Sequence, residues 1–148
     1  MDKLNITDAY IQQSEGILNI NLEDSLSKFE DLKAYDNLLI IQSSIENSVK
    51  LSIYPIKKGK VIKLTLFGIK LSKKILKEIS KLLQKFQVIH TSGFLKIKKN
   101  IYYECYLNLS VSDNKNKSLN ASLEKIKNIF KEIKIEEVRL KNSKNNQL

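Results

Sequence analysis

The sequence predicts an α+β protein in which helices pack on one face of an antiparallel sheet. Three observations carry this prediction: short segments alternate between apolar and polar residues, two longer segments repeat apolar residues at helical spacing, and polar turns separate them. Between residues 61 and 140 the segments follow the βαββαβ order of ferredoxin-like sandwiches. We therefore expect two helices to cover one face of this sheet.

The first two elements of this region are a strand and a helix. Residues 61–67 alternate with a period of two, which is typical of a half-buried strand, and Gly68 interrupts the pattern. Ser72 then stands where a helix N-cap is expected. The apolar stripe of the predicted helix consists of Leu71, Ile75, Ile79, Leu82 and Phe86, with lysines on its other face.

Two alternating segments, residues 89–97 and 101–109, predict a β-hairpin. If the apolar residues of both segments face one core, Ile97 lies opposite Ile101. The loop between them then has an odd number of residues, namely three.

A second helix and a last strand follow the hairpin. The helix comes after the polar residues 112–117, and its apolar residues are Leu119, Leu123, Ile126, Ile129, Phe130 and Ile133. Residues 135–140 predict a short strand, and residues 142–148 predict a flexible tail.

The region before residue 61 predicts a short helix over residues 24–35 and two strands over residues 38–45 and 49–56. Pro55 disfavours a central position for the second strand. An alternative interpretation is a duplicated βαββ unit over residues 17–56 and 61–111, which would pair strand 49–56 with strand 61–67.

We expect one α+β domain over residues 1–141, with an acidic extension (residues 1–48) and a basic core (residues 49–141). The net charge is +10, with −6 in residues 1–48 and +16 in the remainder. We expect the acidic extension to pack on the basic core and to complete it through Leu38, Ile40 and Ile53, because isolated short strands are unstable in water.

The basic charge allows an acidic partner, but its composition weakens the case for sequence-specific nucleic-acid binding. It comes from 25 Lys and one Arg, whereas Arg is the residue that makes bidentate contacts with bases and phosphates. The abundance of Lys, Ile and Asn is equally explained by an AT-rich genome.

No run of about 18 apolar residues is present, so we expect no membrane span. The first residues lack the pattern of a secretory signal, and Cys105 is the single cysteine. These features predict a cytoplasmic protein without an internal disulfide.

The sequence predicts no enzyme and no bound cofactor or metal. His90 and Ser92 are two residues apart on a strand, too far for direct proton transfer, and no acid is placed to orient the histidine. His90 and Cys105 are expected on opposite faces of the sheet, and no phosphate-binding glycine motif is present.

One candidate binding face remains, on the polar side of the predicted sheet. It comprises Lys63, Thr65, Phe67, His90, Phe94, Lys96, Lys98, Tyr102, Glu104 and Tyr106. Aromatic residues between lysines suit stacking on bases with phosphate contacts. The competing interpretation is that the N-terminal segment or a second subunit covers this face.

The sequence therefore predicts a non-enzymatic binding or assembly module, a homo-oligomer or an adaptor that acts through protein–protein interaction. The first alternative is an RNA- or ribosome-associated protein that uses the lysine and aromatic face. The second is a small-ligand-sensing regulatory domain, with its pocket between subunits or beneath Gly68.

Overall fold

The computed structural model describes residues 6–13, 37–57, 59–68, 72–109 and 113–140, and of these it describes no side chain for residues 45 and 113–116. The fold is α+β, with two antiparallel sheets and two helices in the described ranges. The chain divides into two compact units: unit 1 is Met1–Lys58 with Val138–Leu148, and unit 2 is Gly59–Glu137. The boundary after Lys58 lies beyond the end of the predicted acidic extension. Residues 49–58, which were assigned to the basic core, therefore belong to unit 1. The single domain over residues 1–141 stays a prediction.

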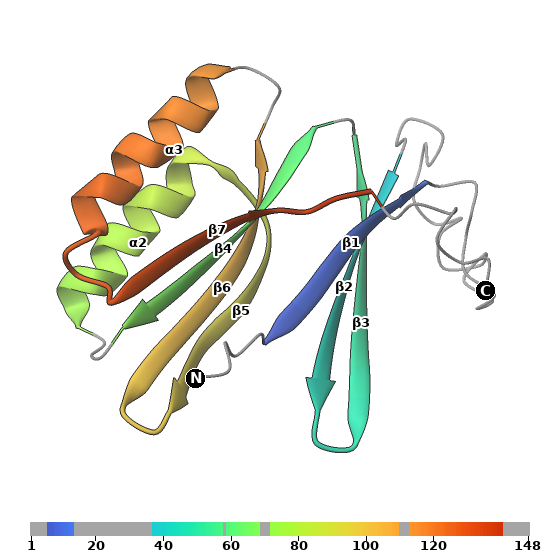
Figure 1. Ribbon diagram of the computed structural model, residues 1–148, viewed down its shortest axis with the longest axis horizontal. Helices are drawn as coiled ribbons and strands as arrows, with labels where there is room; N and C mark the ends of the chain where they lie inside the picture. Colours follow the sequence, from blue (N-terminus) through green and yellow to red (C-terminus); the bar gives the residue numbers. More distant parts are fainter. Residues whose placement is uncertain (1–5, 14–36, 58, 69–71, 110–112, 141–148) are drawn as a thin grey trace. The chain divides into compact units, whose positions relative to one another are not determined.

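Unit 1 contains a three-stranded antiparallel sheet in the order β1-β2-β3 (Figure 1). Its strands are β1 (Thr7–Gln13), β2 (Asn37–Ile45) and β3 (Ser48–Ile56). A parallel bridge joins Ile11 to Leu140, and the Ile11 N–H donates a hydrogen bond to the Arg139 carbonyl oxygen at 3.1 Å.

The two strands predicted over residues 38–45 and 49–56 are confirmed as the β2–β3 hairpin, and β3 lies at the sheet edge, as Pro55 indicated. Strand β1 was not predicted, since its segment holds few strongly apolar residues and its partner lies far along the sequence. The helix predicted over residues 24–35 lies outside the described residues.

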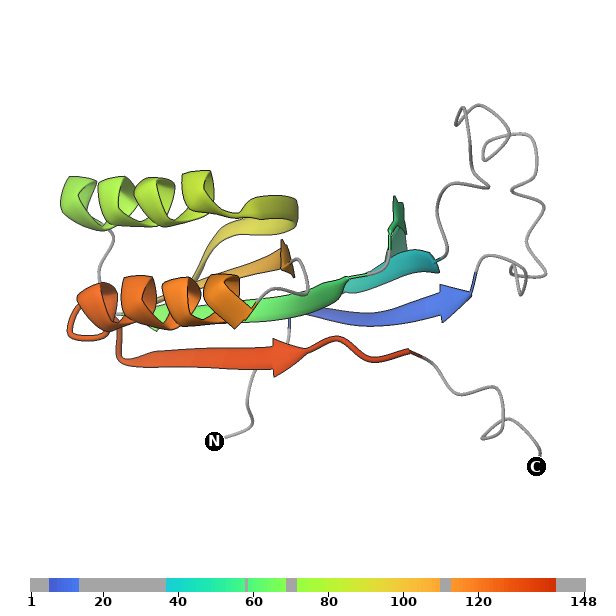
Figure 2. The ribbon, with the colours of Figure 1, turned by 90° about the horizontal axis from the view of Figure 1, so that it is seen from above.

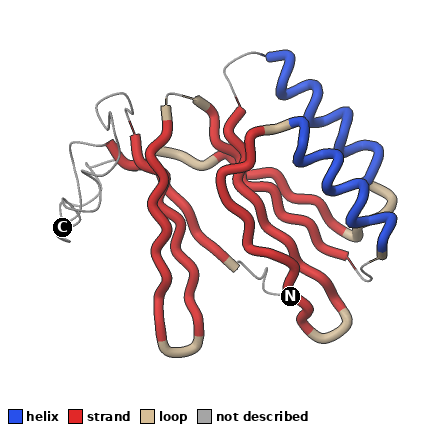
Figure 3. Tube along the Cα trace, turned by 180° about the vertical axis from the view of Figure 1, so that it is seen from behind, coloured by secondary structure: helices blue, strands red, loops and turns tan. Residues whose placement is uncertain are grey.

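Unit 2 contains a four-stranded antiparallel sheet in the order β5-β6-β4-β7, with both helices on one side of it (Figure 3). Helices α2 and α3 lie side by side in two perpendicular views (Figures 1 and 2). The elements are β4 (Lys60–Gly68), α2 (Lys73–Lys85), β5 (Gln87–Ile97), β6 (Asn100–Leu109), α3 (Asp113–Ile126) and β7 (Glu132–Glu137).

The predicted first helix and its cap are confirmed. The Ser72 side-chain oxygen accepts a hydrogen bond from the Ile75 backbone N–H at 3.2 Å, which satisfies one of the unpaired donors of the first turn. Ile79 and Leu82 are buried, while the helix lysines are exposed.

The core of unit 2 lies between the sheet and the two helices. Its buried members are Ile62, Leu64, Leu66, Ile79, Leu82, Phe86, Tyr103, Cys105, Leu107, Leu109, Leu119, Leu123, Ile126 and Phe130. Leu38 and Ile40 are buried in unit 1 and Ile53 is half-buried there, but none of them belongs to this cluster of described residues.

The duplicated βαββ interpretation is wrong, because β4 pairs with β6 on one side and with β7 on the other, while β3 pairs with β2. The end of the second helix was also misplaced: α3 ends at Ile126, and Ile133 lies in β7. Position 133 fits both patterns, since it follows Ile126 at helical spacing and precedes Ile135 at strand spacing. Pairing with β4 decides in favour of the strand.

None of the described helices has the length and apolar character needed to cross a membrane.

Candidate functional site

Residues of β4 and β6 form the centre of the sheet face turned away from α2 and α3, called here the helix-free face. The register pairs Lys63 with Tyr106, Thr65 with Glu104, and Phe67 with Tyr102. Directly paired residues of an antiparallel sheet project to the same side. Six of the predicted site residues therefore lie together.

Strand β5 contributes fewer of the predicted residues than expected. His90 lies opposite Tyr106, with ring centroids 6.1 Å apart in an edge-to-face arrangement. Phe94, however, lies opposite Tyr103 and stacks on its ring at 4.7 Å, and Lys96 lies opposite Ile101. Because Tyr103 belongs to the core cluster, placing Phe94 and Lys96 on the helix-free face is wrong.

A β-bulge in β5 causes this change of face. The register shifts between Thr91 and Phe94, and Gly93 adopts a left-handed φ of 74°. The Ser92 hydroxyl accepts a hydrogen bond from the Glu104 N–H at 3.0 Å and donates one to the Gly93 carbonyl oxygen at 2.8 Å. Because side chains alternate with a period of two, extra residues in one strand reverse the faces of those that follow.

The bulge also explains why the predicted three-residue hairpin loop is wrong. Ile97 pairs with Asn100, which leaves a two-residue loop, and Lys98 within it has a φ of 58°. Lys98 therefore lies in the turn. Leu95 and Ile97 take the positions on the helix-free face, where they are 39% and 37% exposed.

The charged pair at the centre of the helix-free face is buried. The Lys63 Nζ lies 3.3 Å from the Glu104 Oε1, and these side chains are 5% and 0% exposed. Tyr106 beside them is fully buried. Buried charges are tolerated when they are paired and hydrogen-bonded. The centre of the face is thus closed to solvent within a single chain.

A half-buried aromatic pair lies toward one end of the same face. The rings of Phe67 and Tyr102 are 4.8 Å apart, and the Lys131 Nζ lies 5.6 Å from the Phe67 ring centroid. The Lys131 N–H also donates a hydrogen bond to the Phe67 carbonyl oxygen at 2.9 Å. The Lys131 ammonium therefore makes a cation–π contact with the Phe67 ring within the chain itself.

Strand β7 completes the sheet and was only partly found from the sequence. Its register with β4 turns Glu132, Lys134 and Glu136 toward the helix-free face, and it turns Ile133 and Ile135 toward the helices. Lys134 and Glu136 form an ion pair, and the hydrogen bond to Glu136 raises the pKa of Lys134. The alternation of residues 132–136 was the available signal for this strand.

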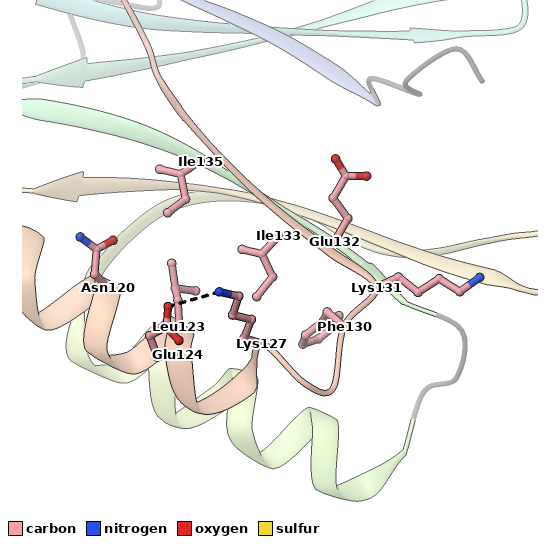
Figure 4. Close-up of a pocket in the computed structure, with 9 residues that line it drawn as sticks. All are labelled: Asn120, Leu123, Glu124, Lys127, Phe130, Lys131, Glu132, Ile133 and Ile135. Carbon is pink, nitrogen blue, oxygen red and sulfur yellow. Dashed lines mark ion pairs between the residues drawn. The ribbon is translucent and has the colours of Figure 1, made fainter.

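A pocket of about 410 Å³ lies between α3 and β7 (Figure 4). Its apolar lining comes from Leu123, Phe130, Ile133 and Ile135. Its charged lining consists of Lys131 and Glu132 and of the ion pair between Glu124 and Lys127, whose Oε1 and Nζ lie 3.7 Å apart. No sequence motif marked this pocket, because its lining comes from two elements that meet only in the folded unit.

Cys105 and His90 lie on opposite faces, as predicted, since Cys105 pairs with Thr91 and His90 pairs with Tyr106. Burial, together with the neighbouring Glu104 carboxylate, raises the pKa of the Cys105 thiol to about 12. At neutral pH this sulfur is a protonated thiol and therefore a poor nucleophile.

No protein-family model matches the chain, and no curated protein matches it significantly.

Proposed function

We propose that this protein is a non-enzymatic assembly module that associates with itself through the β7 edge of its four-stranded sheet. The observation that carries the proposal is the position of β7. It is the last strand of the sheet, and its Ile135 is 43% exposed beside the pocket between α3 and β7. An edge strand offers unpaired backbone donors and acceptors that another strand can satisfy.

The helix-free face is a weaker candidate for this contact. Lys63, Glu104 and Tyr106 at its centre are buried in a single chain, so a second subunit has little of them left to cover. Among the described residues of unit 2, the exposed large apolar side chains lie on α2, β5 and β7. Of these, Leu95 and Ile97 of the edge strand β5 are the ones on the helix-free face, away from its centre.

A non-enzymatic role is supported by the state of the groups that chemistry would need. Cys105 is buried and protonated at neutral pH, and Ser92 is engaged in hydrogen bonds that hold the β5 bulge. These side chains stabilise the sheet.

We also infer that unit 2 is a ferredoxin-like sandwich. The inference is supported by its element order, β4-α2-β5-β6-α3-β7, and by its sheet order, β5-β6-β4-β7, with both helices on one face.

The RNA alternative loses part of its support. Lys63 is paired with Glu104, while Phe94 and Lys96 lie on the helix side of the sheet. The ligand-sensor alternative loses support for one of its two possible pockets, the one beneath Gly68, because a Cβ at Gly68 would lie 3.2 Å from the Phe130 ring. A pocket between subunits is the other one it allows.

Sedimentation equilibrium of the full chain, from low to high micromolar concentration, tests self-association. We expect the mass to rise toward that of a dimer as the concentration increases. A strict monomer over the whole range contradicts the proposal. Filter binding at about 50 mM salt, where electrostatic affinity for RNA is enhanced, tests the alternative in parallel.

A further inference from the structure

We propose that two copies of the chain pair through β7 in antiparallel orientation. Ile135 of one copy then lies directly opposite Ile135 of the other, across the two-fold axis. This inference rests on the proposed self-association and names its surface and register. Among the described strands, β4 is the one that pairs with β7, so the outer edge of β7 has no described strand partner.

Symmetry limits the registers that such a pair can adopt. A two-fold axis normal to a continuous sheet keeps each side chain on its own face, so residues of the same face must lie opposite each other. The axis therefore passes midway between one residue and its own copy, which lie directly opposite each other. An axis centred on a residue has this meaning below. Centring it on Ile135 places Lys134 opposite Glu136 of the second copy, and Ile133 opposite Glu137.

This register is favourable on both faces. On the helix-free face it creates two cross-strand pairs of opposite charge, because Lys134 and Glu136 both project there. On the helix side it brings the two exposed Ile135 side chains together, beside the apolar lining of the pocket. Opposite charges and apolar pairs directly across an antiparallel ladder are stabilising.

The neighbouring registers are less favourable. An axis on Lys134 puts Lys134 opposite itself and Glu132 opposite Glu136, so each of these pairs has like charges. An axis on Glu136 also puts like charges opposite each other. An axis on Ile133 gives Glu132–Lys134 pairs, but it uses only the first part of β7 and leaves Ile135 opposite Lys131, which precedes the strand.

Charge exchange on β7 tests the register. The variants K134E and E136K each place like charges opposite each other twice in the homodimer. Each is expected to weaken dimerisation roughly tenfold. An equimolar mixture of the two variants restores opposite charges at both positions. The heterodimer is therefore expected to form in the concentration range in which the wild-type protein dimerises.

The mixture separates contacts between copies from contacts within one chain. Lys134 and Glu136 already form an ion pair within the chain, and both single variants lose it. That intrachain loss is not repaired by mixing. The matched control is E132K, because residue 132 lies opposite Val138 in the proposed register. E132K by itself keeps both Lys134–Glu136 pairs and is expected to dimerise like the wild type, while its heterodimer with K134E keeps one like-charged pair. An E132K protein that is weakened as much as K134E, and that regains dimerisation when mixed with K134E, would overturn the register in favour of the axis on Ile133.

Disulfide crosslinking provides a second measurement. Two I135C thiols meet across the axis and are expected to give an oxidised dimer, whereas E137C thiols lie opposite residue 133 and are expected to stay unlinked. The wild-type protein could dimerise while I135C fails to crosslink and the mixture of K134E with E136K shows no rescue. That combination would overturn the β7 contact but leave the proposed self-association intact. A monomeric wild type overturns the proposed function and this contact together.

Discussion

At the scale of single residues, the Lys63–Glu104 ion pair of unit 2 is buried on both sides. Replacing Lys63 with Met keeps the length of the side chain but leaves the Glu104 carboxylate without this cation in a site that excludes solvent. We expect K63M to lower the free energy of unfolding by about 3 kcal/mol, because removing one partner of a buried ion pair is costly.

Urea denaturation at low protein concentration measures this change. The matched control is K127M, which breaks the ion pair with Glu124 at the surface of α3, where both side chains are largely exposed. An exposed pair contributes at most about 1 kcal/mol. Equal effects of the two variants would show that burial of the Lys63 pair has no energetic consequence.

Cys105 is a second residue whose environment predicts a measurable property. Its pKa of about 12 makes the thiolate roughly a thousandfold scarcer than in an ordinary thiol at the same pH. We expect iodoacetamide to label the native protein far more slowly than the urea-unfolded protein. Fast labelling of the native protein would contradict the buried position of this sulfur.

The same pKa predicts how stability changes with pH. Between about pH 9 and pH 12 the unfolded chain ionises Cys105 while the folded protein keeps it protonated. The stabilisation is therefore fully present below pH 9, and it falls by about 1.4 kcal/mol per pH unit above that value. Denaturation of C105A across this range should show a shallower decline; the remaining slope includes Tyr103, whose pKa burial also raises.

At the scale of secondary-structure elements, the β5–β6 hairpin depends on two backbone positions with positive φ. Gly93 suits its position, but Lys98 in the turn has a side chain where glycine is favoured. We expect K98G to raise the free energy of unfolding by up to about 1 kcal/mol, because it removes the strain between Cβ and backbone.

The neighbouring loop residue provides the control for this variant. Lys99 is not among the described residues with positive φ, so K99G gains nothing from the conformation and loses stability through the entropy of the unfolded chain. Thermal melting of both variants decides between them. A lower melting temperature for K98G than for K99G would contradict the observed turn.

At the scale of the whole molecule, the chain divides into two compact units. The core cluster of unit 2 lies between residues 62 and 130, within one stretch of chain. We therefore expect a fragment of residues 59–137 to form α+β secondary structure and to keep Cys105 protected from alkylation. Circular dichroism and thiol labelling measure both properties.

A fragment of residues 49–148 tests the prediction that the acidic extension, residues 1–48, packs on the basic core. If that packing exists, the fragment will be less soluble and less stable than the full chain, because apolar surface becomes exposed. A fragment that melts at the temperature of the full chain and stays monodisperse contradicts the packing.

The sequence by itself determined the elements whose burial pattern is local. Strand β4, helix α2 with its Ser72 cap, and the β2–β3 hairpin follow from the spacing of their own apolar residues and turn residues. The α+β class followed from the same spacing, because periods of two and of 3.6 distinguish strands from helices within a few residues.

Only the tertiary structure decided which residues share the candidate site. The β5 bulge moved Phe94 and Lys96 to the helix side, pairing with β4 assigned Ile133 to β7, and burial closed the Lys63–Glu104 pair to solvent. The physical reason is that a strand pattern records which side chains alternate, but not which strand lies beside them. A bulge or a distant partner changes the face and the burial of a residue without changing the local spacing from which its face was predicted.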